Sequence, residues 1–285
     1  MARPIPDSCS LQAWRHLLLR SMRASLSWAL PALASIAAMA APCEAPDNLT
    51  RVTGGGECLL IRTLGHAAEA RTLFVLLHGN HSSGSPAVSQ YRPAEALVQQ
   101  GPSATVAVAL IRPGYNDAEG KYSSGNAAGR ADNFTAENID VVADAIARVK
   151  AFHQARRLVL VGHSGGAAMA GVMLGRYPGL ADAAVLVACP CDVSAWRAMR
   201  GRGGLPWSSE SAIRYVDRIP AATQLAIVVG SADDVTPSAL SVAYAEALRA
   251  RGIATNLSIL AGIDHVAVID SPVVVTEALR LGENR

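Results

Sequence analysis

The amino-acid sequence predicts an α/β fold, in which a mostly parallel β-sheet carries helices on both faces. Short, nearly continuous apolar runs alternate along the chain with longer segments whose apolar residues recur at helical spacing. The apolar runs lack a regular polar–apolar alternation, which is typical of strands buried on both faces of a parallel sheet. An apolar content of 51% and a charged content of 17% allow a large buried core and argue against disorder.

The first 42 residues are expected to form a signal peptide, which takes no part in the fold. Arg15, Arg20 and Arg23 precede an apolar run at 26–40 that ends in Ala-Met-Ala, a sequence typical of a cleavage site. Translation from Met22 would give a signal peptide of more ordinary length. A membrane anchor is the alternative, but the apolar run is short and contains a proline. We therefore expect export to the periplasm or the medium, no stable membrane insertion after cleavage, and one domain over residues 43–285.

The first half of this domain is expected to contain a hairpin, two buried strands and two helices. Three successive glycines at 54–56 indicate a turn between two short strands within residues 48–64. Uninterrupted apolar runs indicate the buried strands, and apolar residues on one face indicate the helices. Residues 112–133 form a long polar loop, and loops of this length are usually functional or mobile. The strands are expected at 73–77 and 105–111, and the helices at 93–100 and 134–152.

The second half repeats the alternation of strand and helix. Thr236 followed by Pro237 predicts a helix start, with the threonine as N-cap and the proline as first helical residue. Gly282 is placed to end the last helix. Residues 189–219 show no clear periodicity. The strands are expected at 158–161, 183–188, 224–229 and 255–260, and the helices at 166–176, 237–251 and 272–281.

The most informative motif lies where the strand at 158–161 meets its helix. Residues 162–166 read Gly-His-Ser-Gly-Gly, which matches the pattern G-x-S-x-G between a strand and a helix. In this context the backbone at Ser164 is strained, so that the hydroxyl stands clear of the sheet. Side chains at Gly162 and Gly166 would collide with the neighbouring strand and helix. The motif therefore indicates an exposed serine nucleophile.

A serine nucleophile needs a histidine to accept its proton and a carboxylate to orient that histidine. In a parallel sheet such groups gather at the carboxyl ends of the strands. Asp233 and Asp234 follow the strand at 224–229, and Asp264 and His265 follow the last strand. The chain order is thus Ser, Asp, His. Asp264 is expected to be a loop residue, and either of the first two aspartates could be the acid.

An oxyanion site needs backbone N–H groups directed at the developing negative charge. The N–H of Gly165 begins the helix after the serine, and we expect the second donor to be the N–H of Asn80, after the strand at 73–77. His78 is expected to form structural hydrogen bonds in this loop. His163 is expected to be a packing or polar residue rather than the base, because its side chain points away from that of the serine.

These motifs resemble those of the α/β-hydrolase fold superfamily, in its serine esterase or prolyl-oligopeptidase-like branch. The resemblance covers about residues 70–281 and implies that Ser164 is the nucleophile, Asp233 the acid and His265 the base. Only about 35 residues separate the strands at 183–188 and 224–229, which leaves room for a small or absent lid. The residues that carry the resemblance are His78-Gly79-Asn80, the motif at 162–166, Gly230-Ser231-Ala232-Asp233 with Thr236-Pro237, His265 and the turn Arg112-Pro113-Gly114-Tyr115.

Four cysteines would remain after cleavage of the signal peptide, and export implies an oxidising compartment. Cys43 and Cys58 could join the N-terminal segment to the first strands. Cys189 and Cys191 are separated by one proline and are expected to lie too close for an easy bridge. Four cysteines allow three pairings, among which the sequence does not choose.

The expected function is that of an exported serine hydrolase that cleaves a carboxylic ester through an acyl-enzyme, with no metal or other cofactor. An amide or thioester substrate is less expected. One alternative is a small peptidase or aminopeptidase of prolyl-oligopeptidase type, and another is a non-catalytic binding protein on a hydrolase scaffold. The net charge of +2, without a basic stripe, gives no indication of a nucleic-acid partner. The sequence predicts a small ester or acyl substrate but neither its identity nor the oligomeric state.

Overall fold

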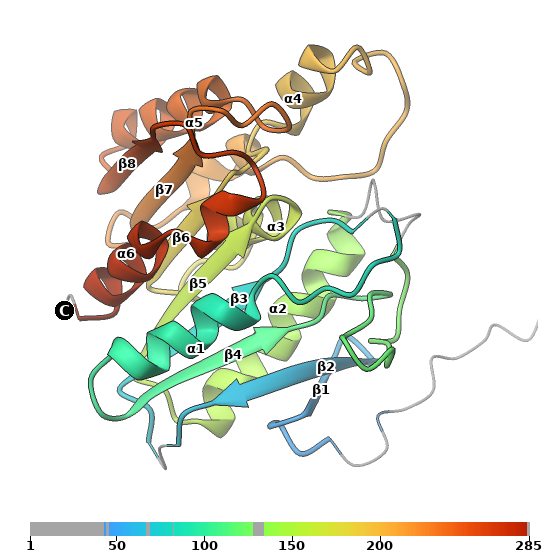
Figure 1. Cartoon of the computed structure of the whole chain (residues 1–285), viewed down its shortest axis with the longest axis vertical. Coiled ribbons are helices and arrows are strands. Elements are labelled where there is room, and N and C mark those ends of the chain that lie inside the picture. The colour runs from blue at the N-terminus through green and yellow to red at the C-terminus, as the bar shows by residue number, and fades with distance from the viewer. Residues whose placement is uncertain (1–42, 44–45, 67–68, 82, 128–133, 284–285) are drawn as a thin grey trace, which may run out of the picture. The chain divides into compact units, whose positions relative to one another are not determined.

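The apolar runs form an eight-stranded, mostly parallel sheet within the described part of the chain (Figure 1). The strand order is β1-β2-β4-β3-β5-β6-β7-β8. Only β1 with β2 and β2 with β4 pair antiparallel, whereas all the other neighbours are parallel. The strands are β1 (Arg51–Gly54), β2 (Glu57–Leu64), β3 (Thr72–Leu77), β4 (Thr105–Leu110), β5 (Arg157–His163), β6 (Ala183–Val187), β7 (Gln224–Gly230) and β8 (Thr255–Leu260).

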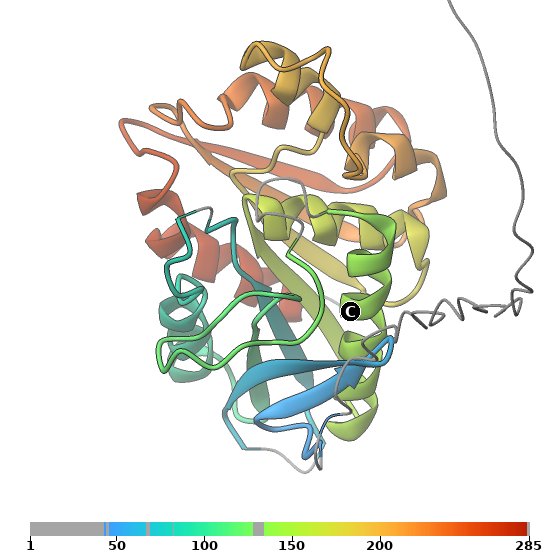
Figure 2. The ribbon, with the colours of Figure 1, turned by 90° about the vertical axis from the view of Figure 1, so that its right-hand side faces the viewer.

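Helices cover both faces of this sheet, as the sequence predicts (Figures 1 and 2). The helices α1 (Tyr91–Gln100) and α6 (Pro272–Glu283) pack on one face, with the 3₁₀ helix η3 (Ala267–Asp270). The helices α2 (Ala136–Phe152), α3 (Gly165–Arg176) and α5 (Ser238–Ala250) pack on the other, with η2 (Ala212–Arg218). The mostly parallel sheet with two helical layers confirms the predicted α/β architecture.

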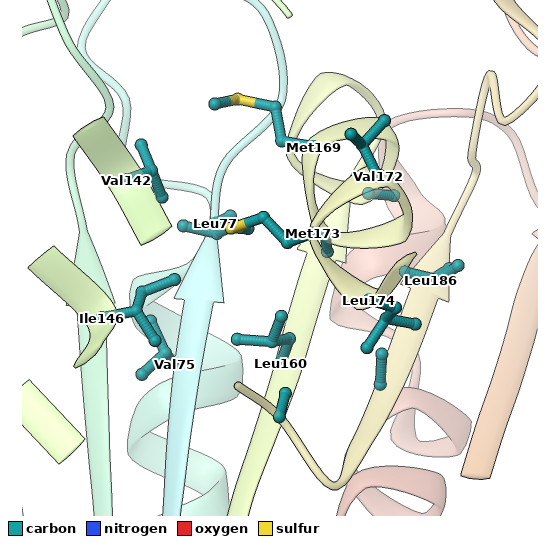
Figure 3. Packing of buried hydrophobic residues seen from close by; sticks show 14 of the residues in the cluster. Val75, Leu77, Val142, Ile146, Leu160, Met169, Val172, Met173, Leu174 and Leu186 are labelled. Atoms are coloured by element: carbon teal, nitrogen blue, oxygen red, sulfur yellow. The ribbon is translucent and has the colours of Figure 1, made fainter. Parts of the chain in front are cut away.

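The core consists of two apolar layers because successive strand residues point to opposite faces. Along β3, Val75 and Leu77 belong to the layer under α2 and α3, whereas the alternate residues Phe74 and Leu76 face α1 and α6. Figure 3 shows Met173 reaching from α3 over Leu77, with Ile146 of α2 in the same layer. All of these side chains are fully buried, and burial of a side chain of this size stabilises the fold by ~2 kcal/mol.

Two predicted helix boundaries are wrong. Pro237 rather than Thr236 is the N-cap of α5, because the threonine hydroxyl is engaged elsewhere, as described below. Gly282 does not end α6, which continues to Glu283. A Cβ atom at Gly282 would lie 2.7 Å from the ring of Phe74, so this glycine allows α6 to approach β3 closely.

The structure contains two disulfides, and one of them contradicts the prediction from the sequence. Cys43 is bonded to Cys58, as the sequence allows. Cys189 and Cys191 also form a disulfide, with their Cα atoms 5.1 Å apart. Residues two positions apart can thus reach the ordinary range of Cα separations for a disulfide when the chain bends between them. Nearness in sequence was therefore no obstacle to this bridge.

The segment between β6 and β7 contains only η2 and the short helix α4 (Val193–Met199). Trp196 and Trp207 of this segment pack against the core, and the indole N–H of Trp196 donates to the carbonyl oxygen of Val235 at 2.7 Å. The segment is therefore a small cover and not a separate cap domain.

The structure, a computed structural model, describes residues 43, 46–66, 69–81, 83–127 and 134–283. The predicted signal peptide at 1–42, with its proposed start at Met22, lies outside these residues, as do positions 128–133 of the long polar loop. Within the described ranges, no helix is long and apolar enough to span a membrane. The same residues contain no group of three or more His, Cys, Asp or Glu side chains that could hold a metal ion.

Candidate active site

The candidate site is built around the sharp turn between β5 and α3. Ser164 has φ +50° and ψ −117°, a strained conformation for a residue with a side chain. Its N–H donates to the carbonyl oxygen of Val187 at 2.8 Å. A Cβ at Gly162 would lie 2.5 Å from the carbonyl oxygen of Gly166, and a Cβ at Gly166 would lie 2.3 Å from that of Leu77. Both glycines are therefore required by close backbone packing, as predicted.

Three side chains from the carboxyl ends of three strands form a hydrogen-bonded chain. Nε2 of His265 lies 3.0 Å from Oγ of Ser164, and Nδ1 lies 2.9 Å from Oδ2 of Asp233. With its proton on Nδ1, the imidazole donates to the carboxylate and leaves Nε2 free to accept the serine proton. The arrangement can therefore generate a nucleophilic serine.

The carboxylate of Asp233 is fully buried and accepts several hydrogen bonds. Oδ1 accepts from the N–H of Thr236 at 2.7 Å and from that of Val235 at 3.0 Å. The Thr236 hydroxyl contacts Oδ2 at 2.8 Å and Nδ1 of His265 at 3.1 Å. Burial acts to raise the pKa of this carboxyl, but the hydrogen bonds from His265 and Thr236 outweigh it and keep the pKa below its usual range. Asp233 is thus held as an anion.

The two other aspartates considered from the sequence occupy different surroundings. Asp234 is exposed and makes no contact with His265 among the described hydrogen bonds. Asp264 accepts from the N–H groups of Val266 and Ala267 at 2.9 and 2.8 Å, and so shapes the turn that carries the histidine. The geometry brings Asp233, and neither of these, to the imidazole.

His163 holds the backbone of His265 through a hydrogen bond. Its Nε2 donates to the backbone carbonyl oxygen of His265 at 2.8 Å, and the two rings lie 5.1 Å apart. Burial, with a smaller contribution from the neighbouring His265, lowers the pKa of His163 from 6.5 to about 4. The neutral ring therefore fixes the backbone position of His265 without adding a second positive charge.

The loop after β3 closes the other side of the serine. A Cβ at Gly79 would lie 3.1 Å from Cβ of Ser164, and a Cβ at Gly165 would lie 2.3 Å from Oδ1 of Asn80. The structure thus brings Asn80 and Gly165, the two residues expected to provide oxyanion donors, against each other beside the serine. His78 is buried, and its Nδ1 lies 2.7 Å from the carbonyl oxygen of Gly79, in line with the expected structural role.

The comparison with protein families decides to which group the chain belongs. A model described as the prolyl oligopeptidase family matches residues 125–278, more than half of the chain. The matched range includes Ser164, Asp233 and His265.

The chain belongs to the prolyl oligopeptidase family.

Membership of the prolyl oligopeptidase family makes the chain a serine hydrolase of the α/β-hydrolase fold. No curated protein sequence matches it significantly. Among solved structures, it is similar to Est1E from Butyrivibrio proteoclasticus, solved with ferulic acid, at 15% identity and a TM-score of 0.61, over 81% of this chain and 96% of that one.

Two further solved structures show the range of this fold. An acylaminoacyl peptidase from Pyrococcus horikoshii aligns at 14% identity and a TM-score of 0.59, over 80% of this chain but only 39% of that one. A serine hydrolase without a lid from Xanthomonas campestris aligns at 18% identity and a TM-score of 0.56, over 85% of this chain and 96% of that one. The sequence thus aligns with nearly the whole of the lid-less hydrolase and with less than half of the acylaminoacyl peptidase.

Sequence reasoning missed two residues that the structure places beside the site. The sequence predicts Thr236 as a helix cap, although its position three residues after Asp233 is a spacing at which a hydroxyl can return to a carboxylate. The sequence indicates Arg112 only as part of a turn, yet its guanidinium is buried against the loop after β3. A basic residue directly after a buried strand is the one signal that could have identified it.

Proposed function

We propose that the chain is an exported serine hydrolase that cleaves a carboxylic ester through an acyl-enzyme on Ser164. The observation that carries this proposal is the hydrogen-bonded chain from Ser164 through His265 to Asp233 at a strained strand–helix turn. Triads of this geometry convert a weakly nucleophilic hydroxyl into an effective one.

In the proposed reaction His265 takes the proton of Ser164 as Oγ attacks the carbonyl carbon. The N–H groups of Gly165 and Asn80 hold the resulting oxyanion, and loss of one such donor typically slows the reaction ~100-fold or more. The imidazolium then protonates the departing alkoxide, and the acyl group remains on Oγ. Water repeats the sequence with His265 as base, which releases the acid and regenerates the serine. Asp233 orients the imidazole and stabilises its charged form throughout.

A small peptidase is the second candidate, because the matching family is that of the prolyl oligopeptidases. We favour an ester because the triad and the oxyanion site suffice for it, whereas peptide cleavage also requires subsites for the chain on either side of the bond. Turnover of a p-nitrophenyl acyl ester series, compared with an aminoacyl-anilide series, separates the two proposals. A non-catalytic binding protein would cleave neither series.

Export is supported by the basic and apolar pattern of residues 1–42 and by the two disulfides, since disulfides persist in oxidising compartments. Fractionation of cells that express the full chain tests this part of the proposal. A mature form shortened by about 42 residues outside the cytoplasm is the expected result, and an unprocessed cytoplasmic form would contradict it.

The central test is labelling of the purified protein with a fluorophosphonate, which reacts only with an activated serine. The wild-type protein should be labelled, and Ser164→Ala and His265→Ala should not. Asp233→Asn should lower the labelling rate by roughly 10⁴-fold, because the imidazole loses its orienting anion. Asp234→Asn is the matched control. It makes the same chemical change at the adjacent, exposed aspartate, and this variant should be labelled at the wild-type rate. A folded wild-type protein that is not labelled would refute the activated serine.

A further inference from the structure

Arg112 is a buried cation beside the candidate site. Arg112 lies two residues after the end of β4 and is only 1% exposed. Among the described residues no carboxylate forms an ion pair with Arg112. The nine ion pairs of that part of the chain all involve other residues. A buried charge without a counter-charge is costly, so folded proteins usually pair such groups. This arginine therefore requires a reason beyond packing.

All the side-chain contacts of Arg112 in the described structure are to uncharged groups. Nη2 donates to Oδ1 of Asn80 at 2.7 Å and to the carbonyl oxygen of Gly79 at 3.0 Å. Nη1 donates to the sulfur of Met169 at 3.3 Å, and the guanidinium lies 4.8 Å from the ring centre of Tyr115. Nε has no hydrogen-bond partner within the described ranges. The positive charge is thus solvated by dipoles but not neutralised.

Two hydrogen bonds, one from Arg112 and one from His78, fix the orientation of a single peptide unit. The carbonyl oxygen of Gly79 accepts from Arg112 and also lies 2.7 Å from Nδ1 of His78. Nδ1 of His78 carries the proton, because Nε2 accepts from the backbone N–H of Arg112 at 3.0 Å. The carbonyl of Gly79 and the N–H of Asn80 belong to one planar peptide and point in opposite directions. Two donors on the oxygen therefore direct the N–H of Asn80 away from the arginine.

The charge itself also lies close to the serine turn. A Cβ atom at Gly165 would lie 3.0 Å from Nη1 of Arg112, and a Cβ at Gly79 would lie 3.1 Å from Cβ of Ser164. The oxyanion formed when Ser164 attacks a substrate carbonyl would thus arise within the same buried region as the guanidinium. The substrate carbonyl is neutral before attack and negatively charged afterwards, so a fixed positive charge stabilises the transition state more than the bound substrate.

We propose that Arg112 is a positioning residue of the oxyanion site, which directs the N–H of Asn80 towards the reacting carbonyl and supplies a buried positive charge that is first balanced when the oxyanion forms. This inference rests on the proposed function, because it requires that Ser164 is acylated.

The test compares Arg112→Met and Arg112→Lys with the wild-type protein. The readouts are kcat and KM for a p-nitrophenyl ester and the inhibition constant of phenylboronic acid, which forms an anionic tetrahedral adduct with an active serine. Arg176→Met is the matched control. It makes the same substitution at an arginine paired with Asp140 at the other end of α3, roughly 16 Å along the helix from Gly165.

For Arg112→Met we expect kcat to fall about 10- to 100-fold and the inhibition constant for the boronic acid to rise by a similar factor, with KM nearly unchanged. Arg112→Lys keeps the charge but not the two-pronged donation, so it should show smaller, parallel changes. Arg176→Met should match the wild-type protein. If Arg112→Met does not fold, the lysine variant decides by the same criterion of parallel changes.

A purely structural role predicts a different result. A folded variant in which boronate affinity is unchanged, or in which KM rises while kcat does not fall, would overturn the proposal. Failure of the proposed function is distinguished beforehand, since the wild-type protein would then neither react with a fluorophosphonate nor bind the boronic acid.

Discussion

Acid should destabilise the fold through His163, and this effect can be isolated by substitution. The side chain is buried, and its Nε2 donates to the backbone of the histidine that contacts Ser164. Burial lowers the pKa of His163 from 6.5 to about 4. The imidazole therefore takes up a proton below pH 6.5 in the unfolded chain, but only near pH 4 in the folded protein. The stability that the neutral ring provides is complete above pH 6.5 and is lost as the pH falls towards 4.

The magnitude follows from the interval between the two pKa values. One pKa unit corresponds to about 1.4 kcal/mol, so the interval from 6.5 to about 4 corresponds to about 3 kcal/mol of unfolding free energy. His163→Phe removes the titrating group but keeps an aromatic ring. At pH 7 this variant should be less stable than the wild-type protein by about 1–3 kcal/mol, because the carbonyl of His265 loses its donor. As the pH falls to 4, that difference should shrink by up to about 3 kcal/mol or reverse its sign.

The assay is urea unfolding, with the disulfides intact, followed by tryptophan fluorescence at pH 7, 6, 5 and 4 for both proteins. The quantity of interest is the difference in unfolding free energy between the two proteins, which cancels the contributions of titrating groups that do not interact with His163. A wild-type-to-His163→Phe difference that stays constant from pH 7 to 4 would show that His163 is not held neutral, and the reasoning would fail.

Three further predictions concern other contacts. Gly166→Ala places a Cβ 2.3 Å from a carbonyl oxygen of β3 and should destabilise the fold by about 2 kcal/mol or more, measured by thermal unfolding. The control is Gly204→Ala, where a Cβ would meet no atom within 4 Å and the loss of stability should stay below about 0.5 kcal/mol. Thr236→Val removes the hydroxyl that contacts the triad carboxylate and should lower kcat roughly 10-fold, whereas Thr236→Ser should restore it; equal rates for the two variants would contradict this role. Replacing both Cys43 and Cys58 by serine opens a loop with a sequence separation of 15 and should cost about 3 kcal/mol in urea unfolding, and an unchanged midpoint would count against the bridge.

The parts of the fold that depend on local sequence could be predicted from the sequence alone. The serine turn was found because its strand, its glycines and its helix are adjacent along the chain. The strand at 224–229 and the aspartate that follows it were found for the same reason, since an apolar run followed by a polar turn marks the carboxyl end of a buried strand. The chain order predicts that Ser164, one of two aspartates and His265 meet, and the resemblance to the α/β-hydrolases favours Asp233. The structure brings Ser164, Asp233 and His265 together.

The features that depend on distant contacts could not be predicted in this way. Gly282 resembles a helix stop, but it lies within α6 because Phe74, more than two hundred positions earlier, occupies the space that a side chain would need. The hydroxyl of Thr236 faces a carboxylate and an imidazole whose approach depends on the packing of β7 against β8. The burial of Arg112 depends likewise on α3 and on the loop after β3, neither of which is near it in sequence.

The distribution of the candidate site over the sheet has a consequence for how folding can be followed. Its groups follow β3, β5, β7 and β8, and neighbouring strands must pair in register before the groups meet. A shift of one residue in any strand would turn its side chains to the opposite face. Collapsed or mispaired chains therefore hold the serine, the aspartate and the histidine apart even when their secondary structure is complete. Recovery of hydrolase activity during refolding would measure the fraction of molecules with native strand register, which circular dichroism does not distinguish.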